Sequence, residues 1–350
     1  MQNLHAGQTP ADERRLLADS IVLRNSQGMR IELTALGATW LSCRLPLRDH
    51  EQREVLLGVD SEQDLLSQQA YLGMTIGPYA NRIANASFAL EGNQYSLHAN
   101  EHGNCLHSGD EAFHTRRWDV SGQKDNQVRF SLVSPDGDSG FPGRLQVSVT
   151  YTVTEENQVR IEYHAISDQP TPVSLTSHAY FNLQGADKGH SCLDHRLWLD
   201  ADEFLPIHDN GIPLGALQDV SGTGFDFRQA KQIRRDLMQD QQQMAVQGYD
   251  HAYLFRANRD VLQPVATLTA PDEQVRMHVT TTMPAIQLYT GNWLKGTPGR
   301  HGKVCSGYAG VALETQFLPD SPNHPEWAQP SCILRPGQDY HHTTCYQFEF

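Results

Sequence analysis

One glutamate in the C-terminal part of the chain directly follows an apolar run. Glu314 comes after Val311, Ala312 and Leu313 in the segment VALETQFLPDSPNHPEW at residues 311–327. A carboxylate in such a setting is partly removed from water, which raises its pKa toward the working range of a general base. The segment therefore predicts a proton acceptor at Glu314.

A histidine in a mixed apolar and aromatic segment is the candidate partner of this base. His178 lies in VSLTSHAYFNLQG at residues 173–185. Histidine has an unperturbed pKa close enough to neutrality to give and regain a proton in each turnover. Taken alone, the same residue could equally be a buried imidazole that is hydrogen-bonded to the backbone.

Two further segments carry polar side chains that suit sugar hydroxyls. Asn81 and Arg82 lie in GMTIGPYANRIANA at residues 73–86, and planar donors of this kind can each bridge two hydroxyls. The alternative for Arg82 is a structural salt bridge. Gln287 lies inside the apolar run PAIQLYTGN at residues 284–292, where an unpaired amide would cost free energy that a sugar hydroxyl could offset.

These segments resemble, in order and spacing, the motifs of the aldose 1-epimerases, the galactose mutarotases. Residues 311–327 are similar to that family's LExQ run followed by PDSPNHPEW, and residues 173–185 to its TNHxYFNL motif. Residues 73–86 are similar to its GRYANRI motif, with Pro78 in place of the first arginine, and residues 284–292 to its ALQxYxGN run. The resemblance implies that Glu314 is the catalytic base and His178 the catalytic acid. It also implies that Asn81, Arg82 and Gln287 bind the substrate.

The resemblance adds two more site residues. His107, in NCLHSGDEAFHTRRW at residues 104–118, looks like the histidine of the family's LHGG motif, and Asp250, in GYDHAYL, resembles the sugar-binding aspartate of its YDH motif. By themselves, the histidine could be structural and the aspartate could cap backbone amides in a turn. The chain departs from the family pattern at Pro78, at Ser108 and at residues 112–115.

The implied activity is interconversion of the α- and β-anomers of free aldohexoses such as D-galactose and D-glucose, by acid/base-catalysed ring opening and reclosure. It requires no cofactor and no metal, and the sequence shows neither a phosphate-cradling loop nor a metal-ligand cluster. Three alternatives stay open. They are a hexose-6-phosphate 1-epimerase of the same fold, a non-catalytic sugar-binding module, and a glycosidase that pairs Asp250 with Glu314.

Strands must position these residues, because alternation of apolar and polar residues dominates the chain. Residues 145–154 alternate strictly, and residues 159–163 continue the pattern after a turn, which predicts an antiparallel hairpin. Further strands are expected at 21–24 with 29–36, at 87–90 with 94–97, and at 275–279, while helices are expected only at 61–69 and 229–241. The sequence predicts an all-β fold, a large antiparallel β-sandwich of the galactose mutarotase-like type. We expect residues 1–350 to form one domain, with 1–19 as a poorly structured lead-in.

Composition narrows the class of partner. The formal net charge of -14 argues against the basic surface that nucleic acid or an anionic membrane would require, and favours a neutral small molecule such as a monosaccharide. The six cysteines show no metal-ligand spacing and are expected to be reduced. No apolar run is long enough to span a bilayer and the first residues lack a signal-peptide core, so we expect a cytoplasmic protein.

Overall fold

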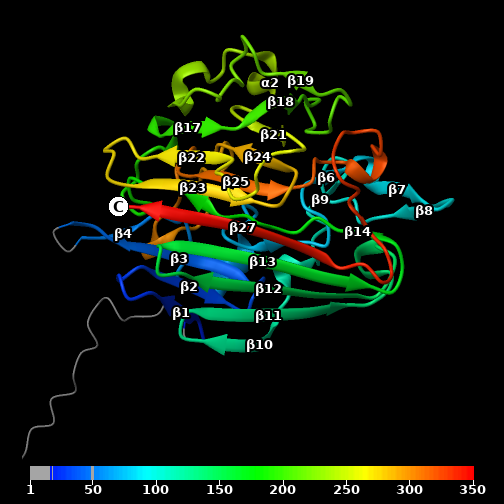
Figure 1. The fold of residues 1–350 in the computed structure, drawn as a ribbon, viewed down its shortest axis with the longest axis horizontal. Coiled ribbons are helices and arrows are strands. Elements are labelled where there is room, and N and C mark those ends of the chain that lie inside the picture. The colour runs from blue at the N-terminus through cyan, green and yellow to red at the C-terminus, as the bar shows by residue number, and fades with distance from the viewer. Residues whose placement is uncertain (1–15, 18, 49–50) are drawn as a thin grey trace, which may run out of the picture.

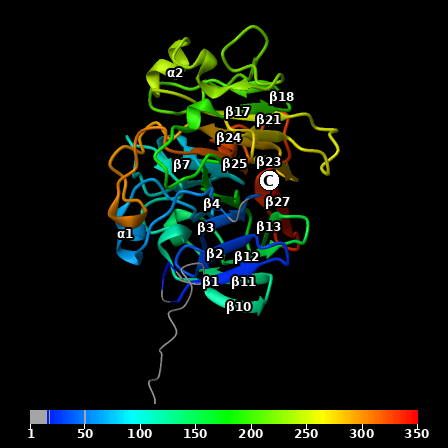
Figure 2. The same cartoon turned by 90° about the vertical axis from the view of Figure 1, so that its left-hand side faces the viewer.

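Two large antiparallel sheets face each other through a continuous apolar core (Figures 1 and 2). The computed structural model describes residues 16–17, 19–48 and 51–350, so the expected lead-in at 1–19 falls almost wholly outside the described residues. The larger sheet has nine strands in the order β10-β11-β12-β13-β27-β23-β22-β17-β20. Their bounds are β10 Asp119–Lys124, β11 Gln127–Ser134, β12 Leu145–Val153, β13 Gln158–Ser167, β27 Tyr340–Glu349, β23 Arg276–Thr281, β22 Ala266–Thr269, β17 Arg196–Leu199 and β20 Lys231–Gln232.

The six-stranded sheet carries most of the strands that reach the candidate site. Its order is β16-β25-β24-β21-β18-β19, and Figure 1 places its central strands behind β22 and β23 of the larger sheet. Thr315 of β25 and Thr344 of β27 join the two layers through their hydroxyls at 2.5 Å. The bounds are β16 Tyr180–Phe181, β25 Val311–Gln316, β24 Ala285–Tyr289, β21 Asp250–Phe255, β18 Ala201–Leu205 and β19 Gln218–Asp219.

A four-stranded sheet and four short strand pairs complete the β structure of the described residues. The four-stranded sheet is built from β1 Ile21–Arg24, β2 Arg30–Thr34, β3 Thr39–Pro46 and β4 Gln52–Glu54, and β1 lies against β11 and β12. The pairs are β5 Thr75–Ile76 with β15 Thr176–Ser177, β6 Arg82–Ile83 with β9 Cys105–Leu106, β7 Ser87–Leu90 with β8 Asn93–Ser96, and β14 Thr171–Pro172 with β26 Ile333–Leu334.

The strand predictions are confirmed, and in the strictly alternating run of β12 and β13 the apolar residues form a buried face. In the hairpin of β12 and β13, Val149 lies opposite Tyr163 and both side chains are buried. The pairs β1 with β2 and β7 with β8 occur where the turn residues predicted them. The fold is all-β and antiparallel, as expected, with only two short α-helices among the described residues, α1 Glu62–Ser67 and α2 Gln241–Ala245.

The two helix predictions have different outcomes. The helix expected at 61–69 is α1, which begins after Ser61, whose side chain accepts a hydrogen bond from the Asp64 amide. The helix expected at 229–241 is wrong. That segment forms β20 and a 3-10 helix at Ile233–Asp236, since Lys231 pairs with β17 and Ile233 is buried in the core. Tertiary contacts override a local helical preference here.

Each of the six cysteines is a free thiol, as expected for reduced residues. Within the described ranges, no helix reaches the length and apolarity that crossing a membrane requires.

Candidate active site

One face of the six-stranded sheet gathers three of the predicted residues. Glu314 on β25 lies directly opposite Gln287 on β24, and Asp250 opens β21 opposite Tyr289. Side chains two residues apart on a strand point to the same face, so these four side chains lie on one surface of the sheet. Leu313 lies on the other face, in the core between the sheets.

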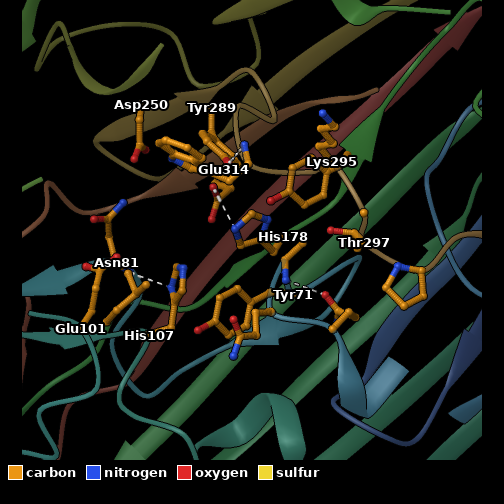
Figure 3. A pocket seen from close by; sticks show the side chains of 18 of the residues that line it. Tyr71, Asn81, Glu101, His107, His178, Asp250, Tyr289, Lys295, Thr297 and Glu314 are labelled. Atoms are coloured by element: carbon orange, nitrogen blue, oxygen red, sulfur yellow. Dashed lines mark hydrogen bonds and ion pairs between the residues drawn. The ribbon is translucent and has the colours of Figure 1, made fainter. Parts of the chain in front are cut away.

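His178 meets Glu314 at the edge of this sheet. It lies in the link between β15 and β16, where its backbone amide donates to Met74 O and its carbonyl accepts from Gly73 N, both at 2.9 Å. Its Nε2 is 3.7 Å from Oε1 of Glu314, and Figure 3 shows the imidazole turned toward the carboxylate. Both side chains are buried, and neither His178 Nδ1 nor Glu314 Oε2 has a hydrogen-bond partner within the described part of the chain.

Burial moves the pKa values of this pair in opposite directions. It raises the pKa of Glu314 well above its usual range, and the nearby Asp250 carboxylate raises it further, while Arg82 opposes the shift. Burial lowers the pKa of His178 to about 3. Removal from water disfavours the charged form of each group. In the free protein the pair therefore prefers its single proton on the carboxylate.

Asn81 and His107 are held together by two short strands, β6 and β9. The backbone amide of Asn81 donates to Nδ1 of His107 at 3.1 Å, and the backbone amide of His107 donates to the backbone carbonyl of Asn81 at 3.0 Å. An accepting Nδ1 places the ring proton of neutral His107 on Nε2. Burial keeps the imidazole neutral by lowering its pKa well below the usual range. His107 can thus donate one hydrogen bond into the site.

The guanidinium of Arg82 forms a structural salt bridge and also faces a carboxylate of the site. Its Nε and Nη2 donate to both carboxylate oxygens of Glu101, at 2.6 and 2.9 Å. Its Nη1 lies 3.6 Å from Oδ2 of Asp250, and Oδ1 of Asp250 accepts from Nε2 of Gln287 at 2.7 Å. The predicted salt bridge is present, and the same contacts orient a carboxylate of the site.

A cavity of about 490 Å³ opens over these residues. Six of the seven predicted site residues line it (Figure 3). They are Asn81, Arg82, His107, His178, Asp250 and Glu314. Gln287 does not line it. Only 2% of Gln287 is exposed, and its side-chain amide donates a hydrogen bond to Asp250 on the same face of the sheet.

Several lining residues were not found by sequence reasoning. They include Tyr71, Glu101, Tyr180, Tyr289, Trp293 and Lys295. Trp293 is 61% exposed, and a tryptophan next to the GN of residues 291–292 is a signal that could have suggested a site rim. The others lie on connectors or inside aromatic strands, where sequence alone gives no reason to prefer the site over the core.

Two of the three departures from the family motifs lie next to residues that line the cavity. Ser108 fixes the turn after β9, since its hydroxyl accepts from Tyr79 N and donates to Tyr79 O. In residues 112–115, His114 is buried and its ring lies 5.0 Å from that of Tyr71. Among the residues that the structure describes, no group of three or more His, Cys, Asp or Glu side chains is arranged to hold a metal ion.

Comparison with known proteins gives one consistent result. Residues 19–347 match the family model for aldose 1-epimerase. The chain is 47% identical to aldose 1-epimerase of Escherichia coli (strain K12), over 94% of each chain, and 36% identical to galactose mutarotase of Homo sapiens, over 91% of each.

Solved structures agree with the sequence matches. An aldose epimerase homologue from C. elegans superposes with a TM-score of 0.86 at 30% identity, covering 94% of this chain and 98% of that one. Galactose 1-epimerase from Lactobacillus acidophilus superposes with a TM-score of 0.81 at 28% identity, covering 94% of both chains. The fold is therefore the galactose mutarotase-like β-sandwich, and the chain belongs to the aldose 1-epimerase family.

Proposed function

We propose that this protein is an aldose 1-epimerase, an isomerase that interconverts the α- and β-anomers of free aldohexoses such as D-galactose and D-glucose. The observation that carries the proposal is the contact of Glu314 with His178, 3.7 Å apart, in a cavity lined by hydroxyl-binding groups. Anomer exchange needs one group that accepts a proton and one that donates it, at the two oxygens bonded to the same carbon.

In this mechanism Glu314 removes the proton of the anomeric hydroxyl while His178 protonates the ring oxygen. The ring opens to the free aldehyde, the first carbon-carbon bond rotates, and reclosure on the other face returns both protons. The productive state needs an ionised Glu314 and a protonated His178. Because burial favours the opposite placement of the proton, the reaction draws on the less populated form of a singly protonated pair.

The other groups hold the sugar hydroxyls. Asn81, Arg82 and Asp250 offer an amide, a guanidinium and a carboxylate to the cavity, and His107 donates from Nε2 near the ring oxygen. Gln287 acts through Asp250, to which it donates a hydrogen bond. A carboxylate that already accepts from one donor and faces another is fixed in orientation before the sugar arrives.

The competing functions fit these contacts less well. A hexose-6-phosphate would need clustered cations, whereas the cations lining the cavity are Arg82, which already pairs with Glu101, and the single Lys295. A binding module without catalysis would have no use for the buried pair of Glu314 and His178. Removing a charged pair from water costs free energy that binding does not require.

Two isosteric substitutions test the proposal. Glu314→Gln removes the proton acceptor and His178→Asn the donor, so each should lower kcat by about 10²- to 10⁴-fold while calorimetry still detects galactose binding. Glu203→Gln and His190→Asn, at exposed positions that do not line the cavity, serve as matched controls and should retain the wild-type rate. If either site variant raised only KM, the assigned role of that residue would be wrong.

The remaining features of the proposal concern the whole chain. One core cluster extends through both large sheets and the four-stranded sheet, which supports a single domain. Six free thiols favour a reducing compartment such as the cytoplasm.

A further inference from the structure

One tyrosine of the cavity wall contacts three buried histidines, two of which also line the cavity. The ring of Tyr71 lies 4.6 Å from that of His107 and 5.0 Å from that of His114, in edge-on arrangements. It lies 5.8 Å from the ring of His178 with an angle of 22° between the planes, which is an offset stack. Figure 3 shows Tyr71 below His178 and beside His107 in the wall of the cavity.

Core packing accounts for only part of this residue, whose ring packs against a small core cluster and also faces the cavity. Tyr71 is only partly buried and lines the cavity, and its hydroxyl makes no hydrogen bond to any described residue. Its backbone adopts a left-handed conformation with φ of 56°, which is uncommon for a residue with a bulky side chain. A conformation of this kind persists only when its surroundings enforce it, and such residues cluster at functional sites.

Backbone hydrogen bonds hold the Tyr71 ring in register with His178. The Tyr71 carbonyl accepts from Met74 N at 2.9 Å, and residues 73 and 74 exchange two hydrogen bonds with the backbone of His178. The buried amide of Gln68 fixes the other end, since its oxygen accepts from Ala70 N at 2.7 Å. The ring of Tyr71 and the imidazole of His178 thus belong to one rigid unit.

We propose that Tyr71 is a positioning residue whose aromatic face stabilises the protonated imidazole of His178. This inference rests on the proposed function, because only acid catalysis by His178 requires an imidazolium at a buried position. Aromatic faces attract cations within about 6 Å of the ring centroid. The ring of Tyr180, two residues after His178, also stacks on this imidazole at 4.8 Å. Two electron-rich rings therefore contact the group that must carry the charge.

The effect on the rate follows from the shared proton. In a singly protonated pair, the fraction with the proton on His178 rises in direct proportion to the stability of the imidazolium. A desolvated cation–π contact changes such an equilibrium by about tenfold. Reversing the electrostatics of the ring at position 71 should therefore lower kcat by about tenfold and leave KM within about threefold.

Fluorination tests this at constant shape, because it withdraws charge from the ring face. Three variants, Tyr71→Phe, Tyr71→4-fluorophenylalanine and Tyr71→pentafluorophenylalanine, should lose kcat stepwise as fluorines are added. Tyr95→Phe and Tyr95→pentafluorophenylalanine are the matched controls. Tyr95 is a partly buried tyrosine of β8 that stacks on Phe88 and does not line the cavity. They should not differ from each other in kcat.

A kcat that does not depend on fluorine number, with all variants folded, would overturn the inference and leave Tyr71 a structural residue. Tyr71→Leu provides the second test, because it removes the ring. Its kcat should fall below that of Tyr71→Phe by about tenfold, and equal losses would assign the effect to the hydroxyl instead. If the wild-type protein did not accelerate mutarotation at all, the proposed function would fail, and that outcome is distinct from both of these.

Discussion

The hydrogen bond from Gln287 to Asp250 leads to a quantitative prediction. Gln287 donates to Asp250 at 2.7 Å and does not line the cavity, so Gln287→Leu should weaken sugar binding only through Asp250. A hydrogen bond to a charged acceptor is worth about 1.5–3 kcal/mol, which corresponds to about 10- to 150-fold in affinity. Arg82 still faces Asp250 at 3.6 Å in the variant. We therefore expect the low end, about a tenfold rise in KM, with kcat within about threefold.

A double-mutant cycle separates this role from direct contact with the sugar. Polarimetric initial rates on α-D-glucose would be measured for Gln287→Leu, Asp250→Ala and the double variant, with the exposed Gln94→Leu on β8 as control. If Gln287 acts through Asp250, its loss should matter little once Asp250 is gone, giving a coupling energy of about 1 kcal/mol or more. Additive effects, within about 0.5 kcal/mol, would show that Gln287 contacts the sugar itself and would refute the reasoning.

Three further predictions concern stability and cofactors. Glu314→Gln should raise Tm at pH 7, since the folded state raises the pKa of this carboxyl and its stability contribution, complete below the unfolded pKa, is lost as pH rises toward the folded value. Each kcal/mol of ionisation cost removed is worth about 1–2 °C in a chain of 350 residues, and an unchanged Tm by calorimetry would contradict the burial argument. Acid should destabilise the protein from about pH 6.5 downward. Five buried histidines and the half-buried His342 have pKa values lowered by burial, and unfolding lets each take up a proton. The loss per net proton taken up is about 1.4 kcal/mol per pH unit, partly offset by carboxyls with raised pKa values, and stability to urea that is flat from pH 7 to pH 5 would count against it. Dialysis against a chelator should leave the mutarotation rate unchanged, because the proposed mechanism uses proton transfer alone; a loss restored only by one divalent ion would refute that mechanism.

Much of the fold could be read from the sequence because burial on one face imposes a period of two on a strand. The hairpin of β12 and β13 shows this, since its inward residues are the apolar ones. The helix prediction for residues 229–241 was wrong because contacts with distant residues, and not the local pattern, set the structure there. The local pattern is compatible with a helix, but pairing of Lys231 with β17 and burial of Ile233 decide the outcome, and both depend on residues distant in the chain.

The site was predictable to the extent that its residues lie in distinctive motifs. Glu314 and His178 fall within 4 Å of each other as acid/base partners would, although they are far apart in sequence. The contacts between side chains around the site could not be predicted. Strand register sets Gln287 diagonally opposite Asp250 on the same face of the sheet, and the path of residues 68–74 brings Tyr71 against three histidines. Neither a register nor a loop path follows from local residue types.

The most direct test of the central claim is polarimetry of freshly dissolved α-D-galactose with and without the protein. Ring opening and reclosure by Glu314 and His178 predict a faster approach to the same final rotation, in proportion to protein concentration, and near loss of that acceleration in Glu314→Gln. An unchanged rate with the wild-type protein would contradict the account, and so would a final rotation different from that of the uncatalysed reaction.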